Sequence, residues 1–178
     1  MIMKDHINLP GLVGVHPTIG DRDPFWGPRF TNMFNCYDAE LRKFAKEVAR
    51  QGFMRSHLYS LIQSATVDKF FKNQKSEINE DRIQEGVYQC ITGPSYETVA
   101  EMKMAQSYGV DALGMSTVYE VLAARQCGLK CLAISLITNE CKTSYDEVNE
   151  VSHKEVVEVA DKEGSKNNDT RIKYLKYQ

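Results

Sequence analysis

The sequence has no long apolar run and no excess of charge of either sign. It holds 22 Lys and Arg residues against 24 Asp and Glu residues, for a net charge of −2. That balance gives no electrostatic reason to expect a nucleic-acid partner or an anionic membrane. No apolar segment approaches the roughly 20 residues that span a bilayer, and the N-terminus lacks the charged-then-apolar order of a signal peptide. We therefore expect neither nucleic acid nor membrane as a partner.

The sequence also lacks any C-x-x-C pair, and its cysteines are odd in number. The five are Cys36, Cys90, Cys127, Cys131 and Cys141. A disulfide framework needs an even number, and a structural zinc site needs closely spaced pairs. The pattern predicts reduced, buried thiols in a cytoplasmic protein, without a metal site.

What the chain does have is an alternation of strand and helix patterns between Gly86 and Asn139. At 178 residues, with 42% hydrophobic and 26% charged residues, it is long enough and ordinary enough in composition for one domain with a core. Strands are expected at Val87–Thr92, Val110–Met115 and Cys131–Ile137, and helices at Thr98–Gly109 and Thr117–Gly128. The last strand is apolar throughout except for Ser135, which is typical of a strand buried on both faces of a parallel α/β sheet.

Polar side chains follow each expected strand. They are Ser95-Tyr96-Glu97, Gly114-Met115-Ser116 and Thr138-Asn139. Open α/β sheets bind ligands beyond the carboxyl ends of their strands. Each group alone has an ordinary structural explanation, such as a helix cap, a dipole partner or a turn. Thr117 and Glu120, for example, have the spacing of a capping box. The joint placement of the three polar groups at one edge of the sheet favours a ligand site.

Three segments resemble the trimeric, low-molecular-mass purine nucleoside phosphorylases. They read GPSYETVAE, GVDALGMSTVYEVLAARQCGL and SLITN, and the likeness resumes at Lys4–Gly11 and near His153. The resemblance implies a phosphorylase-like three-layer α/β fold, with a central mixed sheet and helices on both faces. It implies a homotrimer that cleaves inosine and guanosine to free base and ribose 1-phosphate. Such an enzyme is a glycosyltransferase of the pentosyltransferase type, acting in nucleoside metabolism and purine salvage with phosphate as co-substrate and no cofactor.

The resemblance also implies roles for individual residues. Asn139 and Glu97 would bind the two edges of a 6-oxopurine, and Asn139 would stabilise the leaving base. His153 would bind the ribose 5′-hydroxyl, and Ser116 would donate to phosphate at a helix N-terminus. The remaining expected contacts are with the base or sugar: Tyr96, Leu113, Gly114, Met115 and, from a neighbouring subunit, Trp26.

The chain departs from the family pattern in several places. We expect it to start at an internal Met of that pattern, as a fragment or as a short product, without the family's Gly-rich phosphate loop and Arg/His pair. We expect a single partial domain over 1–178, with an atypical insertion at 53–79 and an atypical tail at 162–178, both poorly ordered, and weak activity. Glu140 stands where a basic residue is common, and Tyr119 replaces a common Pro.

The remaining segments give local expectations only. Asp5–Phe30 is rich in Gly and Pro and is expected to be mostly loop, with Asp5 and His6 as a structural hydrogen-bonded pair. Tyr37–Arg50 has the pattern of an amphipathic helix, with its basic residues on a solvated face, and another helix is expected at Asp146–Asp161.

Two other functions stay open. A methylthioadenosine phosphorylase would need an Asp-containing segment in place of Ser135–Asn139 to hold a 6-amino group, so Asn139 together with Glu97 argues against it. A non-catalytic remnant that binds purine, or that associates with complete subunits, would fit the missing phosphate loop.

Overall fold

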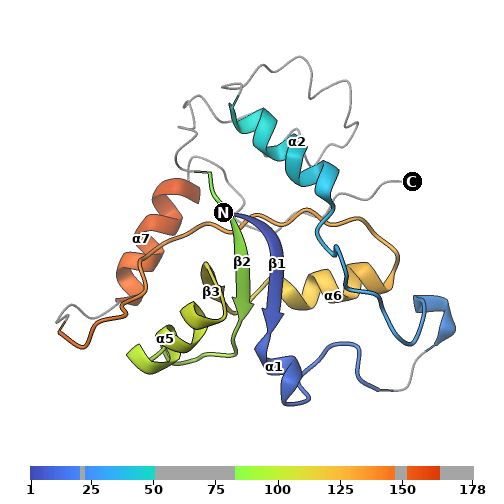
Figure 1. The fold of residues 1–178 in the computed structure, drawn as a ribbon, viewed down its shortest axis with the longest axis horizontal. Coiled ribbons are helices and arrows are strands. Elements are labelled where there is room, and N and C mark those ends of the chain that lie inside the picture. The colour runs from blue at the N-terminus through green and yellow to red at the C-terminus, as the bar shows by residue number, and fades with distance from the viewer. Residues whose placement is uncertain (21–22, 51–82, 147–151, 165–178) are drawn as a thin grey trace.

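A parallel β-sheet forms the centre of the computed structural model, which describes residues 1–20, 23–50, 83–146 and 152–164 (Figure 1). Its strands are β1 (Ile2–Asn8), β2 (Glu85–Cys90) and β3 (Ala112–Gly114), in the spatial order β1-β2-β3. Both strand pairs are parallel, and the register places Asn8 beside Cys90 and Cys90 beside Gly114. The carboxyl ends of all three strands therefore lie at one edge.

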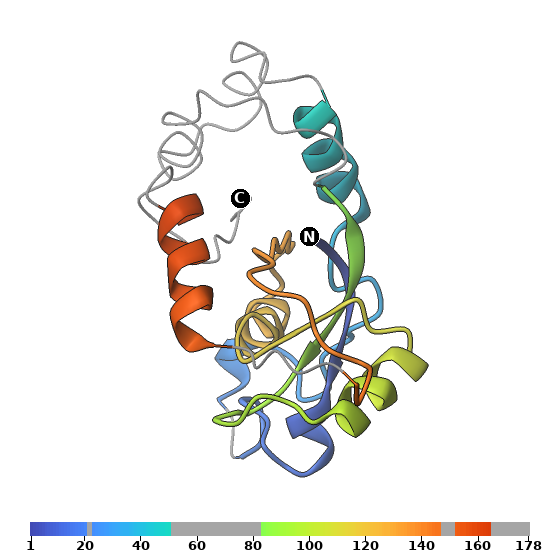
Figure 2. The same cartoon turned by 90° about the vertical axis from the view of Figure 1, so that its left-hand side faces the viewer.

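Helices cover both faces of this sheet. They are α1 (Leu9–Leu12), the 3₁₀ helix η1 (Pro24–Trp26), α2 (Ala39–Arg50), α5 (Val99–Ser107), α6 (Val118–Gln126) and α7 (His153–Gly164). Figure 2 shows α6 on one side of the strands and α5 on the other. The predicted α/β class with helices on both faces is confirmed. None of the described helices is long and apolar enough to cross a membrane.

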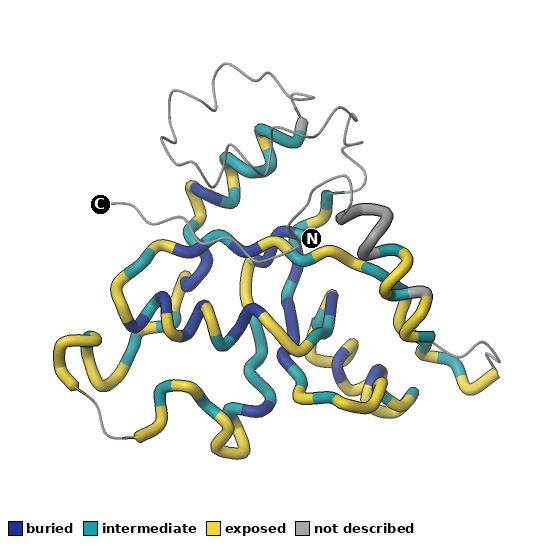
Figure 3. The backbone as a smooth tube through the Cα atoms, turned by 180° about the vertical axis from the view of Figure 1, so that it is seen from behind, coloured by how far each residue is buried: buried dark blue, intermediate teal, exposed yellow. Residues whose placement is uncertain are grey.

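The main core lies between α6 and the sheet. Val118 and Val121 of α6 are completely buried, and Tyr88 and Cys90 of β2 pack in the same cluster. In the tube view the buried positions gather along the strands and one side of α6 (Figure 3). Tyr88 and Cys90 share a face because successive side chains alternate across a strand. This face places β2 directly beneath the start of α6.

Capping explains where α5 begins and ends. The Thr98 hydroxyl accepts from the Glu101 amide at 3.3 Å, and the Glu101 carboxylate accepts from the Thr98 amide at 2.7 Å, which is a complete capping box. Gly109, with φ 73°, follows the last turn as predicted. The capping box expected at Thr117 is wrong, because Thr117 has φ 71° and makes no side-chain cap bond.

The expectation for Cys131–Ile137 is also wrong. This run makes only isolated bridges, and the bridge from Ile134 to Ile2 is antiparallel. The Met3 amide donates to Ala133 O, and the Ser135 amide donates to Met1 O. Cys131 and Ala133 are buried, but Ile134, at 46% exposure, is not. The run therefore lies along the start of β1 with one side covered, not inside the sheet.

The N-terminal region is more regular than predicted. The strand continues to Asn8 and passes directly into α1, so the loop expected from Asp5 begins only after Leu12. The Asp5 carboxylate accepts from the His6 backbone amide, whereas the His6 ring pairs with Tyr37: Nδ1 lies 2.9 Å from the Tyr37 hydroxyl. The expected hydrogen bond between Asp5 and His6 is thus present, and the His6 ring adds a tertiary contact with Tyr37.

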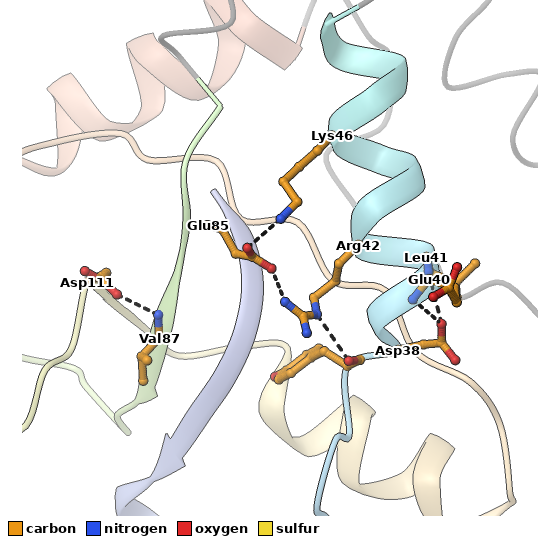
Figure 4. A network of polar contacts seen from close by, with 9 residues as sticks. Asp38, Glu40, Leu41, Arg42, Lys46, Glu85, Val87 and Asp111 are labelled. Atoms are coloured by element: carbon orange, nitrogen blue, oxygen red, sulfur yellow. Dashed lines mark hydrogen bonds and ion pairs between the residues drawn. The ribbon is translucent and has the colours of Figure 1, made fainter.

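Ion pairs attach α2 to the start of β2. Arg42 and Lys46 of α2 both bind the Glu85 carboxylate, with the Lys46 contact at 2.7 Å (Figure 4). Asp38 caps the helix by accepting from the Leu41 amide at 3.0 Å. The prediction of a fully solvated basic face is wrong for Arg42 and Lys46, because α2 packs beside the sheet.

Several expectations concern other segments. The insertion at 53–79 lies outside the described residues, as does the tail beyond Gly164. The last helix begins at His153 and not at Asp146, and it continues to Gly164. Among the cysteines, Cys127 and Cys141 are exposed, so the prediction of burial is wrong for these two.

Candidate functional site

The candidate site is the edge of the sheet where the parallel strands end. The Ile91 amide donates to Gly114 O at 3.0 Å, so β2 and β3 stay paired up to the point where their loops diverge. The loop after β2 carries Tyr96 and Glu97, and the turn after β3 carries Met115 and Ser116. Parallel pairing therefore brings two of the three predicted groups to one edge.

Met115 packs against the loop after β2. Its thioether lies against Gly93, where a Cβ atom would overlap the sulfur, and Gly93 also has φ +63°. Gly93-Pro94 is a cis peptide bond. Met115 is 61% exposed and Tyr96 is 49% exposed, so both present apolar surface outward beside this close contact. Such exposed apolar side chains can pack against a flat ring.

The segment that carries Asn139 reaches the same region. Cys141 is exposed, but partial desolvation of its thiol, together with the charges of Glu97 and Glu140, raises its pKa, so Glu97 lies in the neighbourhood of the chain two residues beyond Asn139. Further along, the Lys103 ammonium lies 4.5 Å from the centre of the Tyr145 ring. The Lys103–Tyr145 contact therefore attaches the segment after Asn139 to α5, the helix that follows Glu97.

Asn139 itself is half-buried, and the oxygen of its side-chain amide already accepts a hydrogen bond. The Thr138 hydroxyl donates to Asn139 Oδ1 at 2.8 Å. This bond orients the amide and leaves its NH₂ group as a donor. A carboxylate at Glu97 and an amide at Asn139 supply acceptor and donor groups in the same neighbourhood. That combination suits a planar ligand with both kinds of group on its edge.

Ser116 stands at the N-terminus of α6 in a strained turn. Thr117 has φ 71° and ψ −51°, and the Val118 amide donates to Ser116 O at 2.8 Å, which is the geometry of a γ-turn. Positive φ is unusual for a β-branched residue. The exposed Ser116 hydroxyl lies 3.2 Å from the Thr117 hydroxyl. A hydroxyl at a helix N-terminus is suited to an anion.

A buried tyrosine lies beneath this turn. Tyr88 is 3% exposed, and burial raises the pKa of its hydroxyl. It also fills the space beside Gly114, where a Cβ would overlap it. The sequence analysis did not single out Tyr88. The available signal was a tyrosine at an inward position two residues before the end of a strand.

Leu113 and Gly114 occupy the last two positions of β3, so both predicted base-pocket residues lie at this edge. Trp26 does not. Its segment attaches to the far end of α6, where Gln126 Nε2 donates to Pro28 O at 2.7 Å. His153 is an exposed residue at the start of α7, and no contact of its side chain with the sheet edge is seen. Six of the nine predicted residues therefore lie at this edge, the segment of Asn139 passes in the neighbourhood of Glu97, and Trp26 and His153 are left out.

No group of three or more His, Cys, Asp or Glu side chains in the described part of the chain could hold a metal ion. The groups at the edge instead offer hydrogen bonds, an aromatic ring, a thioether and a helix N-terminus. These groups can bind a planar heterocycle and an anion side by side.

Comparison with known proteins gives a consistent assignment. The family model of the phosphorylase superfamily matches residues 1–170. Over 159 residues the chain is 44% identical to a purine nucleoside phosphorylase of Anopheles gambiae, which covers 89% of this chain and 38% of that protein. The mouse enzyme of the same name is 36% identical over 158 residues, covering 89% of this chain and 46% of that protein. The chain thus spans less than half the length of these two relatives.

Solved structures give the same picture. A schistosome purine nucleoside phosphorylase in complex with hypoxanthine superposes with a TM-score of 0.75 at 32% identity, covering 93% of this chain and 50% of that one. The Schistosoma mansoni enzyme in complex with inosine gives a TM-score of 0.73 at 33% identity, covering 91% and 48%.

Proposed function

The chain belongs to the phosphorylase superfamily, and we propose that it acts in the phosphorolysis of purine nucleosides. The substrates would be inosine and guanosine, and the products the free base and ribose 1-phosphate. The observation that carries this proposal is the parallel sheet edge, which gathers Glu97, Asn139 and Ser116 in a chain whose relatives are purine nucleoside phosphorylases. Inorganic phosphate is the co-substrate, and the reaction needs no cofactor.

Recognition of the base would rest on Glu97 and Asn139. The Glu97 carboxylate accepts from the N1–H of a 6-oxopurine, a donor that adenine lacks. The Asn139 NH₂ group donates to the N7 edge, where negative charge grows as the base departs, so this bond strengthens in the transition state. Tyr96 stacks on the base, and Leu113 with Gly114 lines its pocket. The location of these residues at one edge supports the assignment.

Recognition of sugar and phosphate would use the other groups. Ser116 donates to phosphate at the N-terminus of α6, and Met115 packs against the sugar. His153 binds the 5′-hydroxyl. Trp26 is anchored at the opposite end of α6, so it would serve the site of a neighbouring subunit in a homotrimer. The five free cysteines suit a reducing compartment, and we place the protein in the cytoplasm.

Phosphate-dependent release of hypoxanthine from inosine by the purified 178-residue chain tests the activity. Because Ser116 is the phosphate ligand that we assign among the described residues, we expect turnover far below that of efficient enzymes. Asn139→Ala should remove most of it, since loss of one transition-state hydrogen bond costs about 10²–10³-fold. Asn32→Ala changes an exposed asparagine outside the edge and should leave the rate unchanged.

Binding measurements separate catalysis from simple purine binding. Calorimetric titration with hypoxanthine should show a Kd that rises on Glu97→Gln, and adenine should bind more weakly than hypoxanthine. Hypoxanthine binding without any phosphate-dependent release would favour a purine-binding module. Absence of both binding and release would refute the proposed function.

A further inference from the structure

An exposed aromatic tip stands at the carboxyl end of α6. The aromatic tip, defined as residues 23–31, contains η1, and its Phe25 and Trp26 are 82% and 58% exposed. Their rings pack edge to face, with centroids 5.2 Å apart. Asp23 caps η1 by accepting from the Phe25 amide at 2.9 Å. The tip is therefore ordered within itself, although its rings face outward.

One buried side chain joins this tip to the helix. Gln126, the last residue of α6, is 6% exposed. Its Nε2 donates to Pro28 O at 2.7 Å, and its Oε1 accepts from the Thr31 hydroxyl. The Pro28 carbonyl can only accept, so it must face the NH₂ group, and this orientation turns Oε1 toward Thr31. Both polar ends of the Gln126 amide are therefore bonded to the tip.

The main chain of the same residue also limits how the tip can lie. A Cβ built on Gly27 would overlap the Gln126 carbonyl oxygen, and Gly27 has φ +113°, a conformation that favours glycine. Helix α6 is itself held in the core by Val118 and Val121, which are completely buried. The tip is therefore attached, through both the side chain and the main chain of Gln126, to a helix that the core holds in place.

We propose that Gln126 is a positioning residue, which holds the aromatic tip against α6 so that Trp26 projects from the subunit in one orientation. The inference rests on the proposed function, in which Trp26 serves the nucleoside site of a neighbouring subunit, and it names the residue that gives Trp26 its direction. An aromatic side chain that is ordered before it meets its ligand lowers the entropy cost of binding. Gln126 touches neither nucleoside nor phosphate, and its effect passes through the tip.

The first test follows the order of the tip in the 178-residue chain. Trp26 is the only tryptophan, so its fluorescence anisotropy reports on the tip. Thr31→Val removes the hydroxyl at nearly constant volume, whereas Thr31→Ser keeps it. Thr31→Val and Gln126→Leu should lower the anisotropy, and Thr31→Ser should leave it unchanged. Tryptic cleavage after the exposed Arg29 should become about fivefold faster in Thr31→Val, the factor for one ordinary hydrogen bond, and faster still in Gln126→Leu.

Gln89→Leu is the matched control. It removes a similarly buried glutamine, 2% exposed, from β2 instead of α6. It should change neither the anisotropy nor the cleavage after Arg29. Unchanged values in Gln126→Leu, or equal changes in Gln89→Leu, would overturn the inference. If Gln126→Leu does not fold, the comparison of Thr31→Val with Thr31→Ser carries the test, because Thr31 is only half-buried.

The kinetics of inosine phosphorolysis separate the positioning role from the proposed function. Gln126→Leu should raise the KM for inosine by about as much as Trp26→Ala and change kcat little, since the lost contact is one of binding. The double variant should be no worse than Trp26→Ala. An unchanged KM in Gln126→Leu, despite a loosened tip, would refute the role of Gln126 at the nucleoside site. Absence of hypoxanthine release by the unmutated chain, with the anisotropy and cleavage results as expected, would sink the proposed function and leave Gln126 as the residue that orders the tip.

Discussion

Substitution of Gly114 by alanine tests the packing under the candidate site. A Cβ built on Gly114 overlaps the Tyr88 hydroxyl oxygen and lies 3.0 Å from Tyr88 Cζ and 3.4 Å from Cε2. Tyr88 cannot swing aside into solvent because it is 3% exposed and packed in the core beneath α6. The ring must therefore shift within the core.

The cost can be worked from these contacts. Overpacking by one carbon in a well-packed core costs about 1–3 kcal/mol. We therefore expect Gly114→Ala to lower the free energy of unfolding by about 1–3 kcal/mol. In a Tyr88→Phe background the overlapping oxygen is already gone, and the closest remaining contact, at 3.0 Å, needs a shift of a few tenths of an ångström.

The assay is urea unfolding of both single variants and the double variant, followed by circular dichroism and extrapolated linearly to water. The double variant should be more stable than the sum of the single effects predicts, by at least about 1 kcal/mol. Gly109→Ala is the control: its φ of +73° makes alanine strained, but nothing lies within 4 Å of the added carbon. Its cost should add to that of Tyr88→Phe without coupling. Additive costs for Gly114→Ala as well would refute the contact.

Three further predictions concern stability, each checked by equilibrium unfolding. Glu85→Gln should destabilise by less than about 1 kcal/mol at neutral pH, since both ion-pair partners are partly exposed. Hydrogen bonding from Lys46 lowers the pKa of Glu85, so that deficit should vanish as the pH falls through the lowered pKa; a deficit that persists in acid would contradict the pairing. Thr98→Ala should cost about 1 kcal/mol through loss of the cap, whereas the neighbouring Ser95→Ala should cost little. Burial lowers the pKa of His6 below 6.5, so the unfolded chain binds the proton first and stability should fall as the pH drops through 6.5. His6→Asn should reduce this dependence of stability on pH. An unchanged dependence would show that another titrating group causes it.

Local signals in the sequence predicted the helix ends and the positions of two strands, because these features depend on only a few neighbouring residues. Gly109 and Gly128 both have positive φ and follow helix ends where the pattern placed them. β2 and β3 lie within a few residues of their predicted positions. Such positions are readable because glycine and the change of hydrophobic period act over a few residues.

The features that the sequence did not predict depend on packing between residues that are far apart in the chain. The apolar run after Cys131 indicates burial, but periodicity cannot specify which strand it borders or in which direction. Its amide and carbonyl bonds go to Met1 and Met3, more than a hundred residues away. Thr117 is the clearest case, since its sequence signature is a cap whereas its backbone is a γ-turn at the start of α6. The site residues were predicted through resemblance to a family, and the close approach of Tyr88 to Gly114 required coordinates.

The charges at the proposed base site constrain how the purine leaves. Glu97 and Glu140 both act on the Cys141 thiol, so two carboxylates lie close to the segment that carries Asn139. Under the proposed function, these carboxylates would oppose the negative charge that grows on a departing purine. The Asn139 amide, its oxygen engaged by Thr138, offers N7 a donor that would stabilise this charge without transferring a proton. The Asn139 donor would therefore offset part of the repulsion from Glu97 and Glu140.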